Sequence, residues 1–255
     1  MSIAPFVFTS TLQDMLRPKR FAIWVIVAIA MVVLGQVFLR FTPTSTATMA
    51  YSTLSELIVF RILALAAAIF ATGVVSQEVE QKTIVYLLTR PVPRPVLILA
   101  RTLAASVTVS VVGILAALGT ALGTRSTIGE LFFRDCSALI LGSFAYCALF
   151  VLVSLLINKS MVINLIFAFG YEAAVPKMPG DIYKVSINSY LMSIASHPKI
   201  APVTSDAAPV ATPAAVNTIQ PGAAWLAMIG LVVLCSMFNA QWFDRNEYVP
   251  REDGD

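Results

Sequence analysis

Long apolar stretches with almost no charge recur along this sequence, and they constrain its fold more than any other feature. A helix needs about 20 mainly apolar residues to cross a ~30 Å hydrocarbon core, because lipid offers no partner for an unpaired N–H or C=O group. The stretches that we predict to span are residues 21–39, 57–75, 96–122, 136–158, 160–175 and 223–243. The sequence therefore predicts an all-α integral membrane protein with six transmembrane helices in one domain.

The composition agrees with a membrane protein and excludes other classes. Of the 255 residues, 58% are hydrophobic and 12% are charged, against about 45–50% and about 25% in a soluble domain. The mean hydropathy is +0.83. A net charge of +3 is too small for a nucleic-acid surface, so lipid and not nucleic acid is the expected partner. The three cysteines lie in apolar runs without CxxC spacing, which disfavours a disulfide framework or a zinc site.

Two of these stretches have alternative interpretations. Residues 160–171 form an uncharged run too short to span, so the fifth stretch could instead be a re-entrant or core segment. Residues 21–50 resemble a signal peptide in having small residues after the apolar run, but the run is longer than a usual signal core.

The distribution of Lys and Arg predicts the orientation, because cytoplasmic loops retain positive charge. With the N-terminus inside, ten basic residues fall in or near inner segments and six in outer segments. We therefore expect a multi-pass protein of the cytoplasmic (inner or plasma) membrane with both termini cytoplasmic. The charged residues of the spans all lie near a predicted span end, where we expect them to reach the interface, which disfavours an ion-driven carrier. These residues are Arg61, Arg101, Arg134, Asp135 and Glu172.

Three further features lie ahead of, between and within the spans. An elbow helix is predicted over 5–20, because Phe8, Leu12, Met15 and Leu16 share one helical face, as in helices that lie in the membrane surface. The external segment 177–222 is expected to hold a short amphipathic helix at 182–194 and an extended loop after it.

Gly119 and Gly123 form a GxxxG spacing in the third span, which lets another helix approach closely. Two interpretations are open: packing within the bundle, or a contact between chains.

The sequence contains no GxxxxGK[ST], HExxH or GxSxG motif. The chain thus lacks the loop that cradles nucleotide phosphates in P-loop proteins. We therefore expect that it is not an enzyme and that it binds no cofactor itself. If the protein does work on a molecule in the membrane, its energy should arrive through the cytoplasmic face.

The segment 76–94 is unusually long and patterned for a connector between two spans. Glu78 and Lys82 are spaced for an i, i+4 ion pair, and Pro91 and Pro93 end the helical pattern. The apolar residues Val75, Val79 and Leu87 share a face with Thr83. Such a helix suits docking in the groove of a partner protein; the alternative is a solvated, positively charged connector.

This loop resembles that of ABC-2-type ABC transporter permeases. The matching residues are Gln77-Glu78-Val79-Glu80-Gln81-Lys82-Thr83, Tyr86-Leu87-Leu88 and Arg90-Pro91-Val92-Pro93-Arg94. In that family an acidic residue precedes a Gly-Thr or Lys-Thr step, a Leu-Leu pair follows, and a Pro-x-x-Arg turn ends the loop; Lys82 stands where glycine is frequent. The nearest subgroup is the permeases associated with copper-enzyme maturation and multidrug export.

The resemblance implies a permease subunit, expected to work as an exporter, whose ATP and Mg²⁺ are bound by separate ABC ATPase subunits. A second permease protomer would complete the pathway, as a homodimer or a heterodimer. The loop would be a cytoplasmic coupling helix, and the residues assigned to the ATPase interface are Glu78, Val79, Glu80, Gln81, Lys82, Thr83, Leu87, Arg90 and Arg94. The alternatives are a subunit that passes ATPase motion to an external partner without moving a substrate, and a scaffold without an ATPase.

Overall fold

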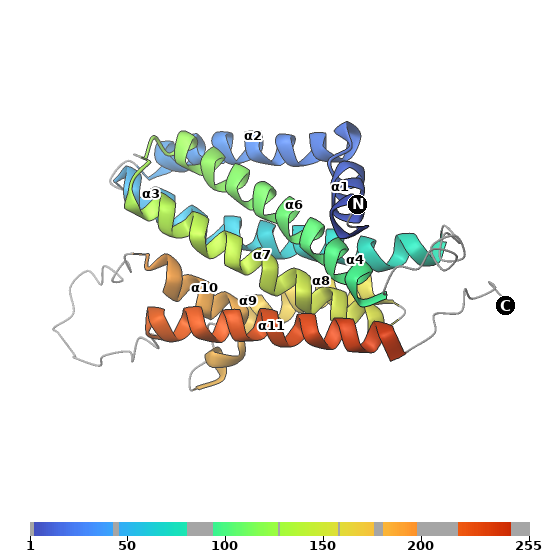
Figure 1. The fold of residues 1–255 in the computed structure, drawn as a ribbon. Coiled ribbons are helices and arrows are strands. Elements are labelled where there is room, and N and C mark those ends of the chain that lie inside the picture. The colour runs from blue at the N-terminus through green and yellow to red at the C-terminus, as the bar shows by residue number, and fades with distance from the viewer. Residues whose placement is uncertain are drawn as a thin grey trace.

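The protein is described by a computed structural model over residues 3–42, 46–80, 94–126, 128–157, 159–175, 181–197 and 219–245. Every regular element in these ranges is a helix (Figure 1). In chain order they are α1 (Ile3–Met15), α2 (Pro18–Phe41), α3 (Ala47–Leu54), η1 (Ser55–Val59), α4 (Phe60–Glu80), α6 (Arg94–Gly123), α7 (Glu130–Leu156), α8 (Ser160–Ile166), η2 (Phe167–Tyr171), α9 (Glu172–Ala174), η4 (Asp181–Val185), α10 (Ile187–Ala195) and α11 (Pro221–Arg245).

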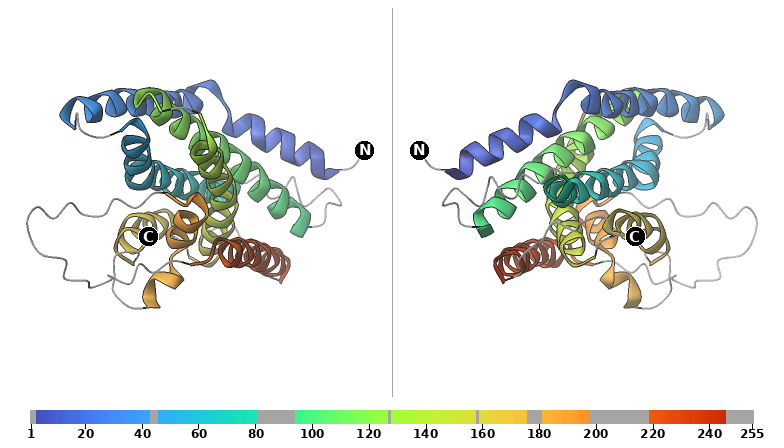
Figure 2. Two further views of the ribbon diagram at one scale, coloured as in Figure 1. Left: turned by 90° about the vertical axis from the view of Figure 1, so that its left-hand side faces the viewer. Right: turned by 90° about the vertical axis from the view of Figure 1, so that its right-hand side faces the viewer.

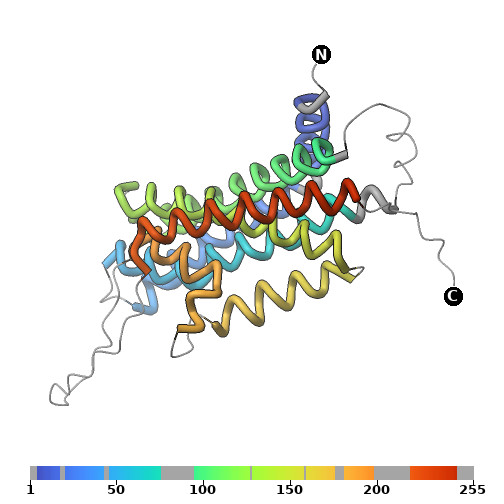
Figure 3. The backbone as a smooth tube through the Cα atoms, turned by 60° about the horizontal axis from the view of Figure 1, so that its bottom comes forward, coloured from blue at the N-terminus to red at the C-terminus, as the bar shows by residue number. Residues whose placement is uncertain are grey.

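The long helices lie side by side and define two ends of a bundle. One end holds α1, the last turn of α4, the first turn of α6 and the last turn of α11 (Figures 1 and 3). We call it the α1 end, and we call the opposite end, where α3 lies, the α3 end. The N-terminal helix and the last turn of α11 therefore lie at the same end of the bundle.

Within the described residues, five helical segments are long and apolar enough to cross a membrane. They are Phe21–Phe41, Ala47–Val75, Pro95–Gly123, Glu130–Leu156 and Pro221–Arg245. These correspond to the predicted first, second, third, fourth and sixth spans. The described residues thus form a multi-pass, all-helical membrane protein.

The predicted fifth span corresponds to a shorter apolar helix, Ser160–Ala174. At ~1.5 Å per residue it is roughly 22 Å long, less than a ~30 Å hydrocarbon core. Its middle is the π-helical turn η2, and α10 then continues towards the α3 end (Figure 1). Whether this segment crosses the membrane by itself stays a prediction.

Two spans begin earlier than hydropathy predicts, and the reason is the burial of polar residues. The second span starts at Ala47 in place of residue 57, and α7 starts at Glu130 in place of residue 136. The added turns carry Tyr51, Ser55 and Asp135, which a hydropathy criterion excludes. Each of these three side chains is at most 1% exposed, because they pack against one another between the helices.

The GxxxG pair lies in the contact between α6 and α2. A Cβ atom added at Gly119 would lie 2.5 Å from the Ala28 carbonyl oxygen, and one added at Gly123 would lie 2.4 Å from the Val32 carbonyl oxygen. Gly35 of α2 faces the Gly123 backbone in the same way. The intra-bundle interpretation is therefore confirmed for this pair, since only glycine lets the two backbones come this close.

The helices α6 and α7 lie at the centre of the bundle, with α2 and α11 on opposite sides (Figure 2). The central helices bury mainly alanine and other small residues, such as Ala104, Ala105 and Ala145 at 0% exposure. By contrast, α2 and α11 present large apolar side chains outwards, among them Ile26 at 64% and Leu226 at 75% exposure. Such faces suit contact with lipid.

Candidate functional site

The predicted ATPase interface lies at the α1 end of the bundle. The backbone of Glu78, Val79 and Glu80 forms the last turn of α4, and Arg94 is the first residue of α6. Gln81, Lys82, Thr83, Leu87 and Arg90 lie outside the described residues. Helix α4 therefore continues past the predicted span end at residue 75, as the pattern of Val75 and Val79 predicts. Whether this continuation belongs to a coupling helix stays a prediction.

Helix α1 lies across this same end, at a large angle to the bundle (Figures 1 and 2). Its predicted face is partly buried: Met15 is 5% exposed, and the Thr108 hydroxyl of α6 points at the Met15 sulfur from 3.9 Å. Phe8 and Leu12 are half-buried. The helix ends at Met15 and not at residue 20, because Pro18 starts α2 at a position where its missing N–H costs no hydrogen bond. An elbow role for α1 stays a prediction.

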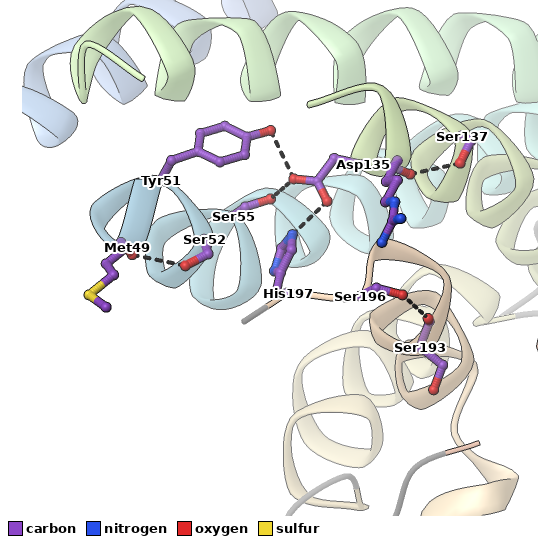
Figure 4. A network of polar contacts seen from close by, with 10 residues as sticks. Met49, Tyr51, Ser52, Ser55, Asp135, Ser137, Ser193, Ser196 and His197 are labelled. Carbon is purple, nitrogen blue, oxygen red and sulfur yellow. Dashed lines mark hydrogen bonds and ion pairs between the residues drawn. The ribbon is translucent and has the colours of Figure 1, made fainter. Parts of the chain in front are cut away.

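Asp135 is the centre of a buried polar cluster at the α3 end (Figure 4). Its Oδ2 accepts hydrogen bonds from the hydroxyls of Tyr51, at 2.8 Å, and Ser55, at 2.7 Å. Its Oδ1 lies 2.6 Å from Nε2 of His197, which follows the C-terminus of α10. Nε2 donates to this oxygen when it carries the ring hydrogen, as in the Nε2–H tautomer. Asp135 is 0% exposed, so the expectation that it reaches the interface is wrong.

Glu172 is the centre of a second buried cluster, at the N-terminus of α10. Its carboxylate accepts from the Ser186 hydroxyl at 2.7 Å and from the backbone N–H groups of Ile187, at 3.1 Å, and Asn188, at 2.9 Å. A carboxylate is well placed there, because the first N–H groups of a helix have no partner within the helix. Glu172 is 4% exposed, so it too is buried where we expected it at the interface.

Both clusters fix α10 inside the bundle. Ile187, Leu191, Ile194 and Ala195 of α10 are at most 5% exposed, and the helix contacts α7 and α11. The predicted external amphipathic helix at 182–194 is thus a 3₁₀ turn followed by a helix that packs in the bundle. Among the described residues, no three His, Cys, Asp or Glu side chains are grouped as metal ligands.

Two asparagines join other helices to α7. Asn164 of α8 donates to Thr72 of α4, at 3.1 Å, and to the Phe150 carbonyl and the Ser154 hydroxyl of α7, both at 3.3 Å. Asn239 of α11 donates to the Ala148 carbonyl at 2.9 Å. In lipid, such interhelical hydrogen bonds define which helices pair, because apolar surfaces gain nothing by leaving lipid for one another.

Sequence reasoning missed both carboxylate clusters. The available signal was weak: Tyr51, Ser55 and Asp135 lie near the ends of two spans that meet on the same side. His197 is the only histidine in the chain and was assigned to an external segment. Nothing in the local sequence indicates that it returns to Asp135, which is 62 residues away.

The comparison with protein families agrees with the helical layout and with the loop motif. A family model described as "ABC-2 family transporter protein" matches residues 7–175, which include most of α1, the segment 76–94 and both carboxylates. A comparison with curated proteins gave no match. Since the family model covers well over half of the 255 residues, the chain belongs to the ABC-2 family of transporter proteins.

Proposed function

We propose that this chain is the membrane-spanning subunit of an ATP-driven exporter that works with separate ABC ATPase subunits. The observation that carries the proposal is the ABC-2 match across residues 7–175. Its support is the α1 end of the bundle, where α1, the end of α4 and the start of α6 come together (Figure 1). We place this end in the cytoplasm and both termini with it, on the charge distribution of the sequence.

The ATPase would engage the segment 76–94, as the resemblance implies. Helix α4 is continuous with η1 and α3, so one helical segment runs from Ala47 to Glu80. At ~1.5 Å per residue this segment is roughly 50 Å long, which exceeds the thickness of the hydrocarbon core. A displacement at Glu80 would therefore be passed through the membrane to the α3 end. ATP and Mg²⁺ would remain on the partner subunit.

A second permease protomer would complete the pathway, because one such bundle supplies half of a two-fold transporter. The exposed apolar faces of α2 and α11 leave room for both lipid and a second copy. ATP-driven closure of the ATPase pair would then shift the two halves between inward-facing and outward-facing states.

A second candidate function is transmission of ATPase motion to an external partner without passage of a substrate. The observation that favours it is α10, which is fixed to the bundle at both ends and leads directly into the predicted external loop. A transmitter needs that loop to bind its partner, whereas an exporter continues to move substrate when residues 201–216 are removed.

Charge reversal at the proposed interface tests the function. Glu80→Arg places an unpaired charge in the contact, which costs roughly 2–5 kcal/mol if the partner group is buried. We expect capture of the ATPase subunit from solubilised membranes to weaken at least roughly 30-fold, since 1.4 kcal/mol is about tenfold. Thr83→Pro should weaken it further by breaking the helix.

The matched control is Glu56→Arg, the same change in the same long helical segment at the α3 end, where Glu56 is exposed. It should capture the ATPase normally and insert in the membrane in normal amounts. Normal capture and normal ATP hydrolysis by the Glu80→Arg and Thr83→Pro chains would remove the coupling role of the segment 76–94.

A further inference from the structure

The two carboxylate clusters at the ends of α10 differ in how easily they can separate. Glu172 and Ser186 are 14 residues apart, and the Glu172 carboxylate also accepts two backbone N–H groups. Those N–H groups would lose their partner in a buried setting if Glu172 moved away, at a cost of about 1–3 kcal/mol each. This end of α10 is therefore a fixed attachment.

By contrast, the contact between Asp135 and His197 can separate more easily. Asp135 keeps two donors on Oδ2, from Tyr51 and Ser55, when His197 leaves Oδ1. The His197 side chain is 6% exposed and lies at the α3 end, so its ring needs only a small movement to reach water. A pocket lined in part by Thr48, Tyr51 and Glu130 lies on the Tyr51 side of the cluster. Separation of His197 from Asp135 thus leaves fewer buried groups unpaired than separation of Glu172 from α10 would.

The donors to Asp135 lie on the helix that also forms part of the proposed ATPase interface. Tyr51 is on α3, and Ser55 is the first residue of the π-helical turn η1, both within the segment Ala47–Glu80. A π-turn is a local irregularity of a helix, and such turns are frequent at functional sites. The second π-turn, η2, directly precedes Glu172. Each cluster at an end of α10 is therefore next to a π-turn.

We propose that Asp135 and His197 form the releasable contact of a gate at the α3 end, between α10, which stays attached at Glu172, and the moving segment Ala47–Glu80. In the closed state His197 covers Asp135 and Ser55 from water. Movement of the segment Ala47–Glu80 displaces Tyr51 and Ser55 together with Asp135 and separates the carboxylate from His197. Both are positioning residues, and the role of this contact in transport rests on the proposed function.

Water access to Ser55 measures the gate without ATP or substrate. The probe is a negatively charged, membrane-impermeant methanethiosulfonate reagent on Ser55→Cys, in a chain whose three native cysteines are replaced by alanine. We expect slow labelling with His197 present, because Ser55 is 0% exposed, and at least tenfold faster labelling with His197→Ala. His197→Gln keeps a side-chain N–H donor and should restore slow labelling.

The matched control is Lys184→Ala, which removes the exposed ion pair with Asp181 in the same segment of the chain. It should leave the labelling rate unchanged. Equal rates with His197 and His197→Ala would overturn the gate contact, whatever the function of the protein. Faster labelling in the Lys184→Ala and His197→Gln chains as well would also overturn it, because general loosening would then be the cause.

The link to transport is measured by the labelling rate of Ser55→Cys, with His197 and Asp135 in place, in the assembled complex. We expect slow labelling without nucleotide and labelling at least threefold faster with ATP and vanadate. Equal rates in a complex that hydrolyses ATP would overturn the gating role while leaving the permease function in place. Failure of the wild-type chain to capture any ABC ATPase would contradict the proposed function, and the gating role would fall with it.

Discussion

Gly123→Ala is predicted to destabilise the bundle by forcing α2 and α6 apart. The new Cβ atom would lie 2.4 Å from the Val32 carbonyl oxygen, whereas non-bonded heavy atoms prefer about 3.5–4.0 Å. The two helices must therefore separate locally by about 1 Å. Over-packing of this kind costs typically 1–3 kcal/mol. Because the atom that it meets is backbone, no side-chain rotation can relieve the contact.

The control for this variant is Gly230→Ala on α11, where an added Cβ atom meets nothing within 4 Å. Alanine is a better helix former than glycine by roughly 0.5–1 kcal/mol, so the control should be unchanged or slightly more stable. The comparison of the two chains thus separates the steric effect from the change in helix propensity.

Thermal unfolding in detergent measures the difference through a thiol-reactive dye on Cys147 and Cys235, which are 0% and 4% exposed in the folded chain. At about 2–4 °C per kcal/mol for a chain of this size, Gly123→Ala should unfold roughly 2–12 °C below the wild type. Equal unfolding temperatures for the Gly123→Ala and Gly230→Ala chains would refute the close approach of α2 and α6. Loss of cross-linked dimer with unchanged thermal stability would instead support a contact between chains.

Three other outcomes follow from the same structure and sequence. Asn164→Leu should lower stability by roughly 0.6–1.7 kcal/mol in a thermal shift assay, because Thr72 keeps its bond to the Ala68 carbonyl. Asp135→Leu should cost more, because it removes the acceptor shared by Tyr51 and Ser55, and the opposite order would contradict the two predictions. Cysteine placed at Thr204 should react with an impermeant maleimide in intact cells and cysteine at Asp253 should not; labelling at 253 would exclude six spans with both termini inside. The purified chain should bind no radiolabelled ATP, and stoichiometric binding would contradict the dependence on a partner ATPase.

The helices of the bundle were predictable because a membrane span is a local property of the sequence. In lipid each helix must satisfy its own backbone N–H and C=O groups, so a long apolar run is sufficient to indicate it. An N-terminal helix ahead of the first span was predicted, but its end was placed at residue 20 and not at Met15, although Pro18 limits the conformation of its own neighbourhood. The family resemblance was likewise carried by a contiguous motif in 76–94.

The position of α10 and the burial of its two carboxylate partners were decided only by the tertiary structure. Asp135 is satisfied by Tyr51, Ser55 and His197, which are 84, 80 and 62 residues away in the sequence. The role of the Gly119 and Gly123 spacing was decided in the same way, by the α2 backbone that packs against it. A polar or small residue in an apolar helix specifies that it needs a partner or a close neighbour, but only the packing of distant segments determines which one, because hydrogen bonds and steric fit act over a few ångströms in space.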